Sequence, residues 1–79
     1  MNISDWWELL LTTENTLADI IQKFYPSAVN NFHKACRAKQ DSEVYRIIHE
    51  VWFRVPDKQW IHSISGWGIL CDLCSEYPH

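Results

Sequence analysis

The chain has 79 residues, a formal net charge of −3 and five tryptophans. Its length fits one domain, residues 1–79, whose folding hides only about 60% of the surface of the unfolded chain. Three cysteines, an odd number, disfavour a secreted disulfide scaffold. No apolar run approaches the ~20 residues that cross a bilayer, and the N-terminus lacks the basic start of a signal peptide. We therefore expect a small, mildly acidic protein in the cytoplasm of the producing or infected cell, with no membrane partner.

Apolar residues recur three and four positions apart along most of the chain, which is the spacing of amphipathic helices. The chain has only two glycines and few clustered strand signals, so a turn-rich β fold is disfavoured. The predicted fold is all-α, a compact single domain of four or five short helices. The expected helices cover residues 4–11, 14–25, 27–38, 42–55 and 66–75.

The first expected helix, over residues 4–11, is apolar around an unusually wide arc. Its tryptophans and leucines span about 200° of the helix circumference, roughly twice what a surface helix needs. Only Asp5, Glu8 and Thr12 interrupt it. Such a helix is either buried on two sides or rests one side on something outside the domain.

The helix expected over residues 42–55 has the clearest pattern, a single apolar stripe. The stripe consists of Val44, Ile47, Ile48, Val51, Trp52 and Val55. Proline should end this helix at Pro56 and the helix over 14–25 at Pro26, because it lacks an N–H group and disfavours helical backbone before it. The short polar residues that can cap helix starts are Thr13 or Asn15, Ser27, and Asp41 or Ser42.

Two spaced pairs, His33 with Cys36 and Cys71 with Cys74, offer one imidazole and three thiols, the ligand set of a Cys₃His zinc site. Both pairs fall inside expected helices, at apolar positions where free cysteine behaves as a small hydrophobe. We favour core cysteines and no cofactor, with a zinc-stabilised structural module as the alternative. A redox role for Cys71 and Cys74 is disfavoured because no strand precedes their helix.

Nothing in the chain matches a Ser, His and Asp arrangement for nucleophilic catalysis, and no Gly-rich loop is present to hold phosphate. We expect a protein that is not an enzyme. The cations Lys34, Arg37 and Lys39 form a local basic stretch, which leaves a homodimeric, nucleic-acid-associated regulator as a further alternative. The acidic balance of the whole chain makes nucleic acid an unfavoured partner.

The excess of aromatic residues points to a partner surface, since tryptophan is enriched where proteins bind one another. The candidate anchors are Trp6, Trp7, Leu11, Phe53 and Trp60. We expect a non-catalytic module that docks an aromatic face onto another protein, or onto a second copy of itself as a homodimer. A short, tryptophan-rich helical chain without catalytic groups looks like the small accessory proteins of phages and mobile elements. The most concrete hypothesis is therefore an inhibitor of a host protein or defence complex.

Overall fold

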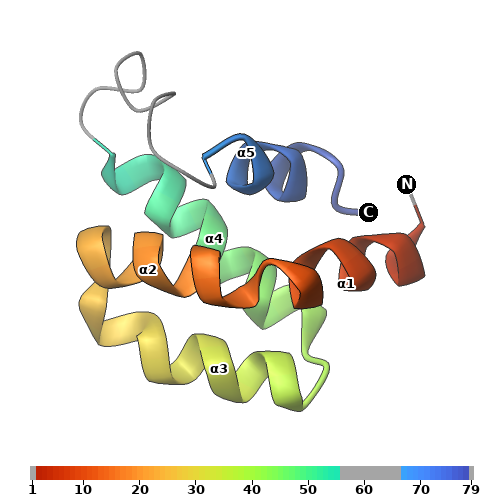
Figure 1. Ribbon diagram of the computed structural model, residues 1–79, viewed down its shortest axis with the longest axis horizontal. Coiled ribbons are helices and arrows are strands. Elements are labelled where there is room, and N and C mark those ends of the chain that lie inside the picture. The colour runs from red at the N-terminus through yellow and green to blue at the C-terminus, as the bar shows by residue number, and fades with distance from the viewer. Residues whose placement is uncertain (1, 56–66, 79) are drawn as a thin grey trace.

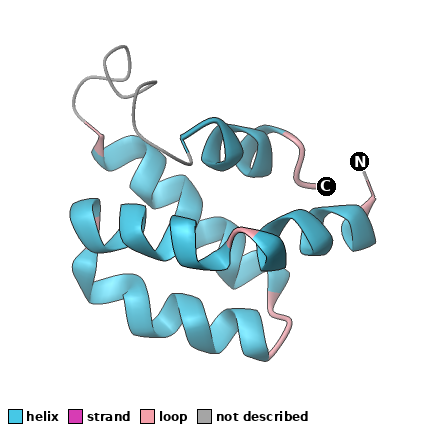
Figure 2. Ribbon diagram, in the orientation of Figure 1, coloured by secondary structure: helices cyan, strands magenta, loops and turns pink. Residues whose placement is uncertain are grey.

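The computed structural model describes residues 2–55 and 67–78, and within these ranges the chain is helical with no strand (Figure 2). This confirms the predicted all-α class. The elements are α1 (Ile3–Thr12), α2 (Glu14–Phe24), a 3₁₀ turn (Pro26–Ala28), α3 (Val29–Arg37), α4 (Asp41–Arg54) and α5 (Trp67–Ser75). Each expected helix is present in this list, with ends shifted by one or two residues.

Helix α4 is the centre of the arrangement, packed against α2, α3 and α5. Figure 1 shows α1 and α2 following one another across the middle, with α3 along one edge and α5 along the opposite edge. Helix α1 also contacts α5. The radius of gyration is 11.5 Å, close to the ~11.6 Å expected for a compact chain of this length. None of the described helices is long and apolar enough to cross a membrane.

The helix starts differ from those expected. The side chain of Asn2, not a predicted cap, accepts a hydrogen bond from the Asp5 backbone N–H at 2.9 Å and caps α1. The Thr13 hydroxyl donates instead to the Leu9 carbonyl at 2.7 Å, so it closes α1 and does not cap α2. Ser27 lies within the 3₁₀ turn. Helix α4 starts after Gln40, without a side-chain cap.

Lys39 lets the chain turn sharply between α3 and α4. Its φ of 55° is left-handed, and the N–H groups of Lys39 and Gln40 donate back to the carbonyls of Cys36 and Ala35 at 3.3 and 3.0 Å. This is the Schellman pattern that ends many helices, usually with glycine at the left-handed position. The turn brings the Lys39 ammonium to 4.9 Å from the centre of the Trp7 ring.

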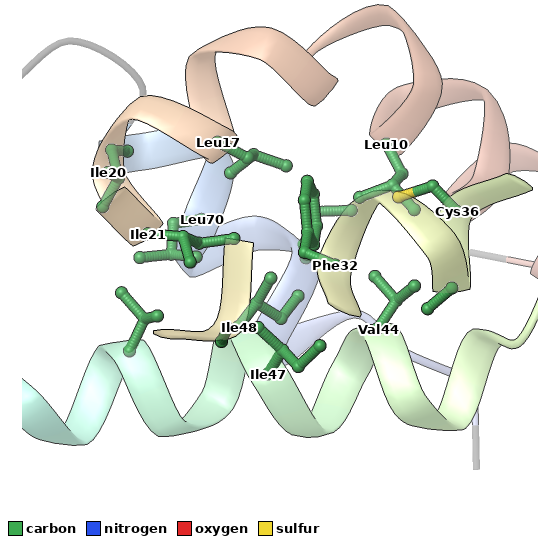
Figure 3. Packing of buried hydrophobic residues seen from close by; sticks show 14 of the residues in the cluster. Leu10, Leu17, Ile20, Ile21, Phe32, Cys36, Val44, Ile47, Ile48 and Leu70 are labelled. Carbon is green, nitrogen blue, oxygen red and sulfur yellow. The ribbon is translucent and has the colours of Figure 1, made fainter. Parts of the chain in front are cut away.

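One apolar core joins all five helices. Figure 3 shows Phe32 of α3 among side chains from α1, α2 and α4, with Leu70 of α5 close by. The buried set is Trp6, Leu10, Leu17, Ile20, Ile21, Ala28, Phe32, Ala35, Cys36, Val44, Ile47, Ile48, Val51, Val55, Leu70 and Leu73. Every apolar residue of the α4 stripe except Trp52 belongs to it, so the sequence pattern located the core side of α4 correctly.

Candidate protein-binding surface

A row of rings runs along the side of α4 that adjoins the apolar stripe. Tyr45, His49 and Phe53 are four residues apart, so they lie one above the other on the helix. The Tyr45 and His49 rings stack with centroids 5.4 Å apart, and the Phe53 ring meets His49 edge-on at 4.8 Å. Phe53 is 65% exposed, the most exposed large apolar side chain among the described residues.

Next to this row, α4 and α5 enclose a shallow groove of about 280 Å³. It is lined by His49, Trp52, Cys71, Cys74 and Ser75. We call this groove together with Tyr45 and Phe53 the α4–α5 face. Trp52, expected in the core stripe, is half-buried and forms part of the groove wall. The face therefore combines a prominent ring with an adjacent apolar hollow, the combination that a protein anchor requires.

Tyr77, after the end of α5, closes one end of the ring row. Its ring stacks on Tyr45 with centroids 4.4 Å apart and planes 13° apart, and it lies 5.0 Å from the ring of Trp6. Its hydroxyl donates to the Asp41 carboxylate at the start of α4. This hydrogen bond raises the pKa of Tyr77 to about 12. The C-terminal segment is thereby fastened to both α1 and α4.

The five predicted anchors do not share one surface. Trp6 is fully buried, and its indole N–H donates to the Leu73 carbonyl at 3.0 Å, so Trp6 is a core residue, whereas the prediction required its ring to be exposed at a surface. Trp7 is half-buried, with its ring beside Trp6 on one side and the Lys39 ammonium on another. Leu11 is 43% exposed on α1. Phe53 belongs to the α4–α5 face, and Trp60 lies outside the described residues.

Trp7 and Leu11 instead belong to a second apolar strip on α1. Ile3, which is 40% exposed, precedes Trp7 by four residues, and Leu11 follows it by four, so the three share one side of the helix. A series of ring contacts runs from Trp7 through Trp6, Tyr77, Tyr45 and His49 to Phe53, and it passes through the buried Trp6 ring. The α1 strip is thus a distinct candidate from the α4–α5 face.

The described residues contain no group of three or more His, Cys, Asp or Glu side chains placed to hold a metal ion. His33 bonds to Glu14 of α2, with 2.7 Å between the imidazole Nδ1 and a carboxylate oxygen. Cys36 is buried in the core, whereas Cys71 and Cys74 line the groove on α5. The fold therefore does not assemble the four residues of the zinc alternative into one site.

All three thiols are held in their protonated form. Burial raises the pKa of Cys36 to about 12, with a further increase from the neighbouring Glu14 carboxylate. Burial also raises the pKa of Cys74 to about 12 and, by a smaller amount, the pKa of Cys71. Since the thiolate is the nucleophile, these surroundings oppose a role in nucleophilic chemistry.

The basic stretch borders a different, wider hollow of about 590 Å³ between α3 and the start of α4. Lys34 lines it together with Asn31, Gln40 and Glu43. Lys34 and Arg37 are exposed and form no ion pair among the described residues, but Lys39 is directed to the Trp7 ring. Of the three cations of the nucleic-acid alternative, Lys34 and Arg37 are thus exposed on α3, and Lys39 lies over the Trp7 ring.

Sequence reasoning missed three residues of the ring series. Tyr45 and His49 precede the predicted anchor Phe53 by eight and four positions, a helical spacing that is visible in the sequence. Tyr77 follows the last helix and carries no periodic signal, so only the folded chain reveals its place beside Tyr45.

Comparison with protein-family models, curated proteins and solved structures finds no match to this chain, so its function has to be argued from its own residues.

Proposed function

We propose that this chain is a non-catalytic binding module that docks its α4–α5 face onto another protein. The observation that carries the proposal is the placement of Phe53. Its ring is 65% exposed, yet it is held against His49 at the end of a stacked row. An ordered, protruding ring loses little conformational freedom when a partner covers it, which is a property of residues that dominate binding energy.

The groove beside Phe53 supports the same proposal. Trp52 and His49 form one wall and Cys71 and Cys74 the other, so an apolar side chain of a partner can enter next to the Phe53 ring. The raised pKa values of both thiols favour a packing role for them over a chemical one. In its most concrete version, the protein is an inhibitor carried by a phage or mobile element that covers a working surface of a host protein or defence complex.

Affinity capture with matched variants tests the proposal. Tagged wild-type chain, Phe53→Ala and Leu11→Ala are each exposed to a lysate of the host cell, and retained proteins are quantified by mass spectrometry. Leu11→Ala is the control because it removes a partly exposed apolar side chain of α1, outside the face. We expect a protein retained by the wild type and by Leu11→Ala and lost with Phe53→Ala.

The molar mass in solution separates a foreign partner from a second copy. Sedimentation equilibrium of the wild type should give the monomer mass of 9.4 kDa. A dimer that Phe53→Ala converts to monomer would assign the face to self-association. Retention of the same proteins by the wild type and by Phe53→Ala would show that the α4–α5 face is not the docking surface. Loss of a retained protein with Leu11→Ala alone would show that the partner binds the α1 strip.

A further inference from the structure

Helices α1 and α5 carry only negative charge. Neither α1 nor α5 contains a lysine or arginine. Asp72 and Glu76 are exposed, and neither forms an ion pair among the described residues. Asp72 lies three residues before Ser75, which lines the groove, so the two residues share a side of α5. The α5 rim of the groove is therefore acidic.

Both arginines of α4 are paired with carboxylates of the same helix. Arg46 contacts Glu43 at 2.5 Å, and Arg54 contacts Glu50 at 3.2 Å, both within α4. Glu50 and Arg54 lie on either side of Phe53 in sequence, and the opposite charges within each pair neutralise one another. Asp72 of α5 and Glu76 just after it, which form no ion pair among the described residues, consequently set the sign of the field at the groove.

The described cations that form no ion pair lie in α2 (Lys23), in α3 (Lys34 and Arg37) and in the turn after α3 (Lys39), and none lies in α4 or α5. Lys34 and Arg37 belong to α3, which Figure 1 shows along the edge opposite α5. No described ammonium or guanidinium group forms an ion pair with the α5 rim. A partner that carries its own cations can therefore complement this rim.

From these charges we infer that the α4–α5 face binds a basic amphipathic segment of another protein. An apolar side chain of the segment enters the groove beside Trp52 and Phe53, and flanking lysines or arginines approach Asp72 and Glu76. This inference rests on the proposed docking function and adds the chemistry of the partner. It matches the mode in which an amphipathic helix lies in a groove between two helices.

A second copy of the chain complements this face poorly. In a symmetric dimer the same patch meets itself, which would place the acidic rims of both copies at one interface. In a head-to-tail contact the rim of one copy would meet α3 of the next. Such a contact gives a closed oligomer only if the rotation between neighbouring copies generates a ring. A basic segment of another protein avoids both the repulsion between acidic rims and the need for ring closure.

Three synthetic 15-residue peptides test the inference by fluorescence anisotropy. The first is an amphipathic helix of leucine and lysine. The second keeps the lysines and replaces leucine by glutamine, and the third keeps the leucines and replaces lysine by glutamate. Only the first should bind, and its dissociation constant should rise with added salt, as expected for rim charges. Equal binding of the second or the third peptide would overturn the inference.

Two variants with the same change of net charge locate the contact. Asp72→Asn should weaken binding of the leucine–lysine peptide by up to about fivefold at low salt, the upper end of the range for an exposed charge pair. Asp19→Asn removes an exposed carboxylate of α2, away from the groove, and should leave the constant unchanged. Equal effects of the two variants would show general attraction to an acidic protein and would overturn the inference.

The peptide experiment tests the chemistry of the partner and the capture experiment tests the docking function, so the two proposals can be refuted independently. If the leucine–lysine peptide does not bind but Phe53→Ala abolishes retention of a protein partner, the docking function stands and the basic character of the segment is wrong. If neither the peptide nor any protein depends on Phe53, both proposals are wrong.

Discussion

Replacement of Trp6 should destabilise the protein more than replacement of any exposed aromatic residue. The Trp6 ring is fully buried and lies against Trp7 and Tyr77. Its indole N–H donates to the carbonyl of Leu73, near the C-terminus of α5, where carbonyl groups have no partner within the helix. Trp6 therefore joins the first helix to the last.

The size of the effect follows from these contacts. Truncation of a buried Trp to Ala costs about 3–5 kcal/mol, whereas a domain of this length has a total stability of roughly 4–12 kcal/mol. Trp6→Ala should therefore be marginally folded. Trp6→Phe keeps most of the apolar ring but leaves the Leu73 carbonyl without its donor, which costs about 1–3 kcal/mol.

Urea denaturation followed by far-UV circular dichroism measures these differences. Phe53→Ala is the matched control, because a ring that is 65% exposed contributes less than about 1 kcal/mol to folding, as surface substitutions typically do. If Trp6→Ala lowers the free energy of unfolding no more than Phe53→Ala, the burial of Trp6 and its link to α5 are wrong.

Three further predictions concern the titratable groups and the thiols. The pKa values of Cys36 and Cys74 are raised from 9.0 to about 12 in the folded chain, so the unfolded chain loses these protons first. The contribution of these two thiols to the free energy of unfolding should be fully present below pH 9 and be lost from pH 9 to 12, and a free energy of unfolding that stays constant across that range would contradict this prediction. Tyr77→Phe keeps the ring stacking but removes the hydrogen bond to Asp41. It should abolish the part of the decrease in the free energy of unfolding that begins near the ordinary tyrosine pKa of 10.0. If urea denaturation above pH 10 gives the same free energy of unfolding for Tyr77→Phe as for the wild type, the hydrogen bond is refuted. Iodoacetamide at neutral pH should modify the half-buried Cys71 before the buried Cys36, and mass spectrometry showing the reverse order would place Cys36 at the surface.

The helices were predictable because their signals are local. Spacings of three and four residues located α4 and its core side, and the residue before Pro56 is extended, as proline requires. The caps were less predictable, since several short polar residues near each start compete and tertiary contacts decide among them. Thr13, for example, bonds backward to Leu9.

The surface was only partly predictable because helical periodicity does not say where the other helices lie. The wide apolar arc of α1 contains both Trp6 and Trp7, and only the position of α5 decides that Trp6 faces inward. Phe53 was recognisable because it lies off the apolar stripe of its own helix. The groove was not, since its walls come from α4 and α5, whose contact is distant in sequence.

The role of the α4–α5 face is tested most directly by the dissociation constant of a captured partner for the wild type and for Phe53→Ala. The exposed 65% of the ring amounts to ~130 Å² of a ~200 Å² side chain, and its burial contributes about 2–3 kcal/mol at ~25 cal/mol per Å² after allowance for the Cβ that alanine keeps. Isothermal titration calorimetry should therefore show a constant weakened roughly 30- to 150-fold by Phe53→Ala and little changed by Leu11→Ala. Equal constants for the wild type and Phe53→Ala would show that the partner binds elsewhere.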